Sequence, residues 1–323
     1  MSRALVLVLA AVSIGCARDY PVPTLTELPP LEPDGVRAFR GELFVPTGDG
    51  VQRLDGDVLR TELGGLPGAL ETLHDTGERL WLSRRDISPD WGSPETVYER
   101  GDEGEWRELP LTGLLVSSAA TAGDEAWIVS VEGLGSPEQR HHLFWWHAAS
   151  LDELPIGGDH LRVFATSAGV YLTSRVYGGG TDLFAWDDDR FVRVAAPHGW
   201  SDDPLLTLAH GRLHAVVDHR LVDVLSGAAF PDPPPIQADD PRNAGVYYEG
   251  NETVLLIQDW VVDTGGWLGG ASSHHEVQID RFDDGWVPAA RLQQILQSAF
   301  WLVDDTLVVC DSSACYRADG PAE

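Results

Sequence analysis

The chain of 323 residues carries 51 acidic and 22 basic side chains, which gives a formal net charge of −29 at pH 7. Because none of the basic residues is lysine, the sequence excludes a Schiff-base lysine, a lysine general base and the lysine-dependent P-loop. Such an acidic chain repels nucleic-acid phosphates, whose binding depends on basic contacts. We therefore expect no DNA or RNA partner.

Residues 1–15 are predicted to be an export signal. Arg3 supplies a positive charge, and Ala4–Val12 is an apolar run too short to span a bilayer as a helix. Small residues follow before a cysteine, as at the cleavage site of a secretory signal.

The run Ser13-Ile14-Gly15-Cys16 resembles the bacterial lipobox, although serine stands where leucine is usual. The resemblance implies that Cys16 is lipidated and becomes the new N-terminus. Because Ala17 rather than aspartate follows the cysteine, it also implies an outer-membrane location, on the periplasmic side or the cell surface. The alternative is an ordinary signal peptide in which Cys16 is coincidental.

The remaining sequence alternates apolar and polar residues, is rich in turns and has almost no helical periodicity. This pattern predicts an all-β protein. We expect residues 16–23 to be a tether and residues 24–323 to form a single β-propeller domain, a fold that reaches this length in one domain.

An internal repeat predicts the fold class, a seven-bladed β-propeller. The phrases Thr61-Glu62-Leu63-Gly64, Arg107-Glu108-Leu109-Pro110 and Asp152-Glu153-Leu154-Pro155 follow one another at intervals of 46 and 45 residues. Tight turns before apolar strands recur seven times along the chain. The predicted blades are Val36–Gly68, Ala69–Leu115, Val116–His160, Leu161–Pro204, Leu205–Pro241, Arg242–Gln294 and Ile295–Glu323.

The last predicted blade has only three strands, Ser298–Val303, Thr306–Cys310 and Cys315–Ala318. The segment Thr24–Leu28 matches the outer strand of the other blades, so we expect the N-terminal strand to complete the last blade and close the ring. Blade five has a proline-rich stretch, Phe230–Pro235, in place of a clear outer strand.

The repeats resemble generic propeller blades and no specific family. The WD dipeptide of WD40 repeats, the paired glycines of kelch repeats and the sialidase box are not found. The resemblance therefore implies a fold and no function.

Cys310 and Cys315 flank a four-residue hairpin loop near the end of the chain. Antiparallel pairing would set them opposite each other, within disulfide distance. Export favours a structural disulfide over two free thiols. A redox-active pair is disfavoured, because the two-residue spacing of such pairs is absent.

Four connections between the second and third strands of a blade are long: Arg84–Pro94, Glu132–Arg140, Arg175–Thr181 and Asp259–His275. These connections lie on one face of a propeller together with the links between blades. Long loops on a rigid scaffold often carry function, so we predict a binding face there.

This predicted face is rich in aromatic and charged residues, types that are enriched at binding hot spots. Trp91, Trp260 and Trp267 are expected to be exposed, whereas the tryptophans in clear strand patterns are expected in the core. The candidate residues are Arg84, Arg85, Asp86, Trp91, Arg140, His141, His142, Arg175, Tyr177, Trp200, Asp202, Trp260, Asp263, Trp267, His274 and His275.

The pairs His141–His142 and His274–His275 lack further ligands at a recognisable spacing, so no metal and no cofactor is predicted. No acyl-transfer motif is present, and no catalytic residue is assigned. We expect a lipid-anchored binding module whose partner is an envelope protein or a glycan, with membrane contact only through the anchor. The alternatives are a hydrolase or lyase acting on polysaccharide, and a structural subunit of an envelope assembly.

Overall fold

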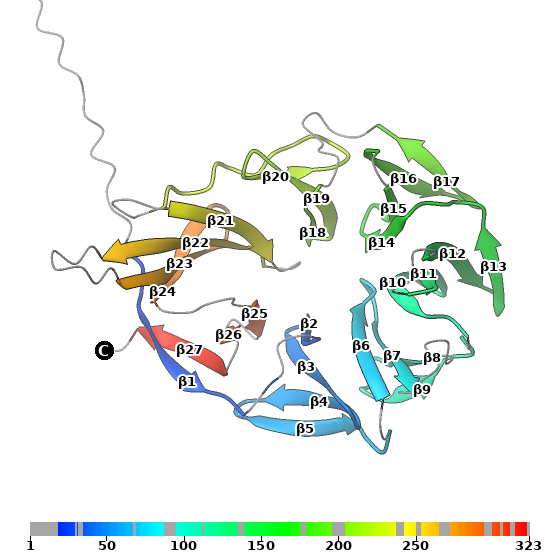
Figure 1. The fold of residues 1–323 in the computed structure, drawn as a ribbon, viewed down its shortest axis with the longest axis horizontal. Helices are drawn as coiled ribbons and strands as arrows, with labels where there is room; N and C mark the ends of the chain where they lie inside the picture. Colours follow the sequence, from blue (N-terminus) through cyan, green and yellow to red (C-terminus); the bar gives the residue numbers. More distant parts are fainter. Residues whose placement is uncertain are drawn as a thin grey trace, which may run out of the picture.

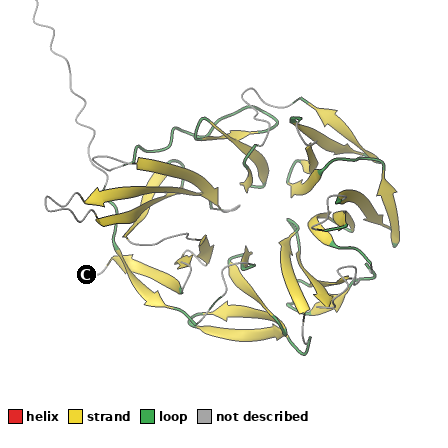
Figure 2. Ribbon diagram, viewed as in Figure 1, coloured by secondary structure: helices red, strands yellow, loops and turns green. Residues whose placement is uncertain are grey.

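The computed structural model describes residues 19–29, 31, 35–66, 69–86, 95–111, 113–134, 139–175, 179–195, 204–236, 242–249, 253–264, 272–293, 299–303, 306–310 and 314–321. All regular secondary structure in these residues is β-strand (Figure 2). They contain no helix of a length and hydropathy that could cross a bilayer. The predicted signal and Cys16 lie outside the described residues.

The protein is a seven-bladed β-propeller, as predicted. Six antiparallel sheets have four strands and one has three, and they stand around a common centre (Figure 1). Blade one contains β2 (Arg37–Phe39), β3 (Glu42–Thr47), β4 (Gly50–Asp55) and β5 (Val58–Leu63). Blade two contains β6 (Ala69–Asp75), β7 (Leu80–Asp86), β8 (Glu95–Arg100) and β9 (Trp106–Glu108). Blade three contains β10 (Val116–Ala122), β11 (Glu125–Glu132), β12 (Arg140–His147) and β13 (Ser150–Leu154).

The second half of the ring continues the same order. Blade four contains β14 (His160–Thr166), β15 (Gly169–Arg175), β16 (Thr181–Asp187) and β17 (Arg190–Val194). Blade five contains β18 (Leu206–Ala209), β19 (Arg212–Val217) and β20 (Arg220–Asp223). Blade six contains β21 (Arg242–Glu249), β22 (Leu255–Thr264), β23 (Ser272–Phe282) and β24 (Trp286–Gln293). Blade seven contains β25 (Ala299–Val303), β26 (Thr306–Cys310) and β27 (Cys315–Pro321).

The N-terminal strand closes the ring, as predicted. Strand β1 (Pro23–Glu27) pairs antiparallel with β27, with Leu25 opposite Ala318 and Glu27 opposite Tyr316. The Leu28 N–H then donates to the Cys315 carbonyl at 2.8 Å. Figure 1 shows the first and last strands of the chain side by side at the rim. The last sheet therefore has four strands, and its outer edge comes from the opposite end of the chain.

The predicted disulfide is present between Cys310 and Cys315. The two residues are direct partners in the β26–β27 ladder, and both are fully buried among apolar residues of blades seven and one. The disulfide therefore links β26 to β27 within the core between blades seven and one.

The hydrophobic core lies between neighbouring blades because both faces of the central strands are covered. In β11 every residue from Ala126 to Val131 is buried, and all of them except Ser130 are apolar, as in a strand covered on both faces. Trp127 of blade three meets the edge of Trp186 of blade four, with ring centroids 5.2 Å apart. Trp81, Trp127 and Trp286 are buried, and Trp145, Trp186 and Trp301 are partly buried in the same clusters, which confirms the expectation for strand tryptophans.

Turns between the first and second strands join successive blades. The Thr121 N–H donates to the Thr76 carbonyl at 2.8 Å, and the Ser167 N–H donates to the Gly211 carbonyl at 2.7 Å. Gly77 has φ +96°, and a Cβ there would lie 2.9 Å from the Ala165 Cβ of blade four. Only glycine fits this approach without displacing the inner strand of blade four.

Blade five departs from the four-strand pattern at its proline-rich stretch, where the outer strand was expected to be unclear. After β20 the chain makes one isolated bridge between Val222 and Ala229, and residues 231–236 are irregular. Prolines lack the N–H that a ladder requires. The Trp286 indole N–H donates to the Pro231 carbonyl at 3.0 Å, so this segment is still fixed against blade six.

Candidate functional site

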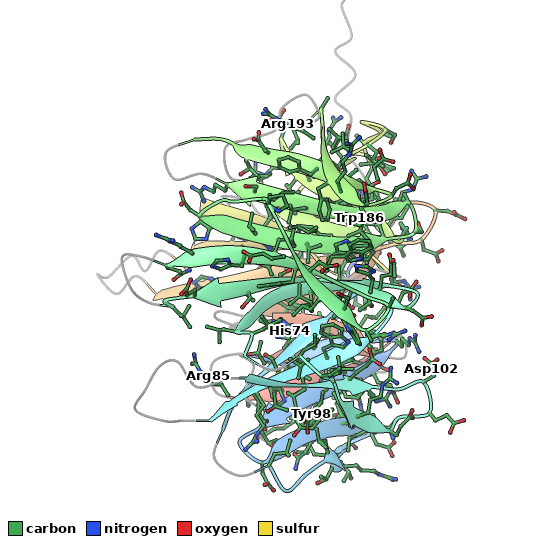
Figure 3. The ribbon with its side chains drawn as sticks, turned by 90° about the vertical axis from the view of Figure 1, so that its right-hand side faces the viewer. His74, Arg85, Tyr98, Asp102, Trp186 and Arg193 are labelled. Atoms are coloured by element: carbon green, nitrogen blue, oxygen red, sulfur yellow. A yellow bond between two sulfur atoms is a disulfide. The ribbon has the colours of Figure 1, made fainter. Side chains whose placement is uncertain are left out.

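The strand ends that carry the predicted binding face share one side of the propeller. Strands in each blade are antiparallel, so the links between second and third strands emerge with the links between blades. Figure 3 shows Arg85, at the end of β7, on the side opposite Asp102, which follows β8. Much of the four long connections lies outside the described residues, so the site is built from the strand ends and the links between blades.

The structure describes the side chains of eight candidates completely enough to place them, and Trp260 is taken separately below. Arg140 is exposed, and Arg84, Arg85, His141, His142, Arg175 and His275 are partly buried. Asp86, Asp263 and His274 belong to strands, but their side chains are not described. The remaining candidates apart from Trp260 lie outside the described residues: Trp91, Tyr177, Trp200, Asp202 and Trp267.

The expectation that Trp260 is exposed is wrong. Strand β22 continues to Thr264, so residue 260 lies inside a strand, opposite Glu276, rather than in a loop. Its side chain is 0% exposed, and the Arg291 guanidinium carbon lies 5.9 Å from its ring centroid. A fully buried indole cannot contact a ligand, so Trp260 is a packing residue.

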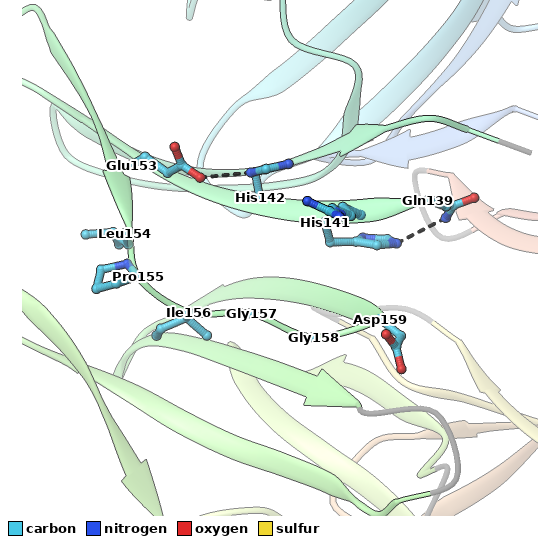
Figure 4. A pocket seen from close by; sticks show the side chains of 11 residues that line it. Gln139, His141, His142, Glu153, Leu154, Pro155, Ile156, Gly157, Gly158 and Asp159 are labelled. Atoms are coloured by element: carbon cyan, nitrogen blue, oxygen red, sulfur yellow. Dashed lines mark hydrogen bonds and ion pairs between the residues drawn. The ribbon is translucent and has the colours of Figure 1, made fainter. Parts of the chain in front are cut away.

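A groove of about 540 Å³ lies between blades three and four on the predicted face. It brings together three of the candidates, Arg140, His141 and His142, at the start of β12. The complete lining is Gln139, Arg140, His141, His142, Glu153, Leu154, Pro155, Ile156, Gly157, Gly158 and Asp159 (Figure 4). The candidates predicted from the sequence lie on the β12 side of the groove, and the residues of the facing side were not predicted.

The facing side is the link between the two blades, and hydrogen bonds fix it to β15. The Ser174 hydroxyl donates to the Gly157 carbonyl at 3.0 Å, and the Asp159 N–H donates to the Arg175 carbonyl at 2.9 Å. A Cβ at Gly158 would lie 2.4 Å from the Ser174 Oγ. The glycine therefore lets the link lie flat against the strand, which gives the groove a firm wall.

His141 and His142 are adjacent in β12 and project from opposite sides of the sheet. Figure 4 shows His141 facing the link between the blades, with His142 turned to Glu153. The His142 Nδ1 lies 2.8 Å from a Glu153 oxygen, and its Nε2 lies 3.2 Å from a Glu132 oxygen. The hydrogen bond to Glu153 is the largest effect that raises the His142 pKa, so His142 is an ion-pairing residue.

His141 is the polar centre of the groove. Its ring meets His160 edge-on, with centroids 5.6 Å apart, and its Nε2 lies 3.2 Å from the Gln139 amide nitrogen. Its Nδ1 is buried and has no hydrogen-bond partner among the described residues. Burial, followed by the neighbouring charge of His160, lowers the His141 pKa. The ring is therefore neutral at pH 7, with one donor and one acceptor nitrogen.

Glu71 is a further functional candidate that the sequence analysis missed. It lies near the start of β6, directly opposite Arg84 in the β6–β7 ladder, on the same face as the groove. Burial raises the pKa of Glu71 to about 7, and the charge of Arg84 opposes that rise. Backbone N–H groups of Thr47 and Gly50 also face the carboxyl group, but neither oxygen completes a hydrogen bond with a described residue. The pairing of an acidic residue with an arginine near the end of a predicted strand could have indicated this candidate from the sequence.

A second buried carboxylate, Glu99, is structural. It is 2% exposed and accepts hydrogen bonds from Arg79 at 2.8 Å, from the Trp81 indole at 3.1 Å and from Arg107 at 3.0 Å. These donors satisfy the carboxylate and join the strands of blade two. Within the described residues, no three His, Cys, Asp or Glu side chains form a cluster that could hold a metal ion.

The comparisons with known proteins name no family. No family model and no curated protein matches the chain. Among solved structures, a periplasmic gluconolactonase of Pseudomonas aeruginosa is similar over 87% of this chain and 97% of its own, at 12% identity and a TM-score of 0.48. The six-bladed lectin of Aleuria aurantia is similar over 80% of this chain and 93% of its own, at 10% identity and a TM-score of 0.40.

Proposed function

We propose that this protein is a lipid-anchored binding module of the cell envelope, and that the groove between blades three and four binds a glycan. The observation that carries the proposal is the partly buried imidazole of His141, which lines that groove and whose Nδ1 has no hydrogen-bond partner among the described residues. A buried polar atom without a partner costs roughly 1–3 kcal/mol. A ligand hydroxyl that reaches this atom after a small rotation of the ring would remove that cost.

The size of the groove favours a small polar ligand over a protein surface. Its volume of about 540 Å³ falls in the range of small-molecule sites, ~300–1,000 Å³. A stable protein interface buries well over 1,000 Å², far more than one groove supplies. A few sugar units fit this volume.

The chemistry of the lining also suits a glycan. Gln139, His141 and Asp159 supply side-chain donors and acceptors, and Leu154–Ile156 supplies an apolar strip on the facing side. Sugars present hydroxyl groups at their edges and C–H groups on their faces, and so need both kinds of surface. The net charge of −29 disfavours a polyanionic ligand, so the proposed glycan is neutral or cationic.

A lipid anchor at Cys16 would present this groove away from the membrane. Only Ala17 and Arg18 lie between Cys16 and Asp19, a reach of about 10 Å. The next residue, Tyr20, hydrogen-bonds to Asp280 of blade six. Blades three and four stand across the ring from the strands β1 and β27 (Figure 1), so the groove would point outward. Metabolic labelling with palmitate tests the anchor: Cys16→Ser should abolish the label and release the protein from membranes.

The groove itself is tested with full-length protein extracted in mild detergent and applied to an array of neutral, cationic and anionic glycans. Wild type should bind a neutral or cationic set, and His141→Ala should lose it. The matched control is His147→Ala. That histidine lies at the far end of β12, where its Nε2 is 2.8 Å from an Asp152 oxygen, and it does not line the groove. Binding to none of the glycans, or glycan binding that His141→Ala leaves unchanged, would contradict the proposal.

A polysaccharide hydrolase or lyase is the second candidate, and Glu71 is the observation that favours it. A carboxyl group with a pKa of about 7 is suited to proton transfer near neutral pH, and Arg84 beside it could stabilise developing negative charge. Assays of polysaccharide turnover between pH 6 and 8 test this candidate. It predicts turnover that Glu71→Gln abolishes, and an inactive wild type would eliminate it.

A further inference from the structure

The opposite face of the propeller has a cavity of its own between blades four and five. Its volume is about 230 Å³, and it lies where the β14–β15 turn meets the start of β19 and the end of β20. The lining residues are Thr166, Ala168, Tyr171, Arg212, Leu213, Asp223, Leu225 and Ser226. None of them lines the groove between blades three and four.

Tyr171 gives this cavity an unsatisfied donor. Tyr171 lines the cavity and is only 4% exposed, and its hydroxyl group makes no hydrogen bond with a described residue. Burial raises the Tyr171 pKa, and the charge of Asp223 acts in the same direction. The hydroxyl group therefore keeps its proton and is available to donate it in a hydrogen bond to a ligand.

Asp223 accepts hydrogen bonds from neighbouring residues and positions Arg212 in the cavity. Its Oδ1 accepts from the Leu225 N–H at 3.0 Å, the Ser226 N–H at 2.7 Å and the Ser226 hydroxyl at 2.8 Å. Burial would raise the Asp223 pKa, but the hydrogen bonds from Ser226, together with the charge of His214 and the hydrogen bond from Arg212, hold the pKa below its usual range. The ionised carboxylate therefore holds Arg212 in place.

Arg212 offers the remaining charge of the cavity. Its Nη1 donates to the Asp223 Oδ2 at 3.2 Å, while the side chain is 57% exposed. Its Nε and Nη2 have no partner among the described residues. A guanidinium group with a free edge matches the two oxygens of a carboxylate, and the Tyr171 hydroxyl group supplies another donor in the same cavity.

We propose that this cavity binds the carboxylate group of a small ligand, between Arg212 and Tyr171. The volume lies below the ~300 Å³ of drug-sized sites, so one carboxylate-bearing unit fits. The carboxylate can belong to a free acid, such as a sugar acid, or to the C-terminus of a peptide. The site is separate from the glycan groove, and either proposal can fail without the other.

Nuclear magnetic resonance titration of the full-length protein tests the proposal. The probes are glucuronate, acetylalanine and the tripeptide Ala-Ala-Ala, each beside its neutral counterpart: glucose, acetylalanine amide and the tripeptide amide. The carboxylates should shift the Tyr171 ring signals with saturable, millimolar affinity, and the neutral compounds should not. Shifts with glucuronate alone would identify a site for sugar acids, and shifts with the tripeptide alone would identify a site for peptide C-termini. Equal shifts with neutral compounds, or no shift with any carboxylate, would overturn the proposal.

Variants separate binding from folding. Tyr171→Phe keeps the ring and removes only a hydroxyl group that has no partner among the described residues, so it should leave stability unchanged and weaken carboxylate binding about 5- to 10-fold. Arg212→Gln should abolish binding. Arg193→Gln, which removes an exposed arginine paired with Asp182 on the outer strands, and His141→Ala should leave it unchanged. Loss of stability in Tyr171→Phe would show that the hydroxyl group has a structural partner and would count against the site.

Discussion

The Tyr20 hydroxyl group lies 2.9 and 2.8 Å from the two carboxylate oxygens of Asp280, 260 residues away in the chain. Asp280 is fully buried in β23 of blade six, whereas β1 belongs to the sheet of blade seven. The Arg291 N–H also donates to the Pro21 carbonyl at 3.0 Å. The N-terminal segment therefore completes blade seven and also bonds to blade six, so it joins two blades at the seam of the ring.

We predict that Tyr20→Phe destabilises the propeller by roughly 1–3 kcal/mol, because the change removes a donor from a buried carboxylate. Chemical denaturation followed by tryptophan fluorescence measures the free energy of unfolding. The control is Tyr98→Phe in blade two, since that hydroxyl group makes no hydrogen bond with a described residue. Equal stabilities of the two variants would show that the bond to Asp280 contributes nothing to closure.

We predict that Gly77→Ala destabilises the protein by about 2–4 kcal/mol. The new Cβ meets Ala165 at 2.9 Å, and φ is +96°, so overpacking adds to backbone strain. Gly123→Ala is the matched control, because Gly123 follows β10 as Gly77 follows β6, has φ +59° and has no atom within 4 Å of a built Cβ. It should cost about 1–2 kcal/mol. Identical losses of stability would rule out the contact with blade four.

Stability should fall on acidification because of His74. Its Nε2 lies 2.9 Å from the Ser83 Oγ, and burial lowers its pKa from 6.5 to about 4. Between these values the unfolded chain binds a proton that the folded chain rejects, so the free energy of unfolding drops by about 3 kcal/mol as the pH falls. Below pH 4 the contribution of neutral His74 to the free energy of unfolding is lost completely.

His74→Gln tests this contribution by comparison with wild type. Glu71 has a folded pKa of about 7 and so works in the opposite direction between pH 4.5 and 7, but it is common to both proteins. The difference in unfolding free energy between the two should change by about 3 kcal/mol from pH 7 to pH 4. A constant difference between His74→Gln and wild type across this pH range would refute the assignment.

The overall fold was predictable because the repeat depends on local chemistry. Glycine-containing turns such as that at Gly77 recur with the period of the blades, and each turn is specified by its own residues. The unmatched segment Thr24–Leu28 predicted the closing strand, since a closed ring leaves no three-stranded blade at the seam. The proline-rich stretch after β20 likewise indicated an incomplete sheet.

The site was predictable only in part because it depends on contacts between distant segments. Gly157 and Gly158 form the wall of the groove through contacts with Ser174, and nothing in their own sequence indicates that role. Trp260 was placed in a loop, although the β-forming run Trp260-Val261-Val262 favours a longer strand. The point at which a strand of a long hairpin ends depends on its pairing with the partner strand, and the local sequence of one strand does not specify that pairing.

We predict that replacing Cys310 and Cys315 with serine lowers stability by about 2 kcal/mol through the loss of loop constraint. Burial of two hydroxyl groups beside the core of blades seven and one adds to the loss. Denaturation of wild type with and without reductant, alongside the double variant, measures the effect. Insensitivity of wild type to a reductant that demonstrably breaks the bond would argue against a stabilising role.

The groove between blades three and four is tested most directly by nitrogen-15 resonances of the histidine rings, recorded during titration with the glycan selected on the array. The account predicts that the Nδ1 signal of His141 shifts with the same affinity as overall binding, while His147 on the same strand stays unchanged. Saturable binding that leaves the His141 signals in place would contradict it.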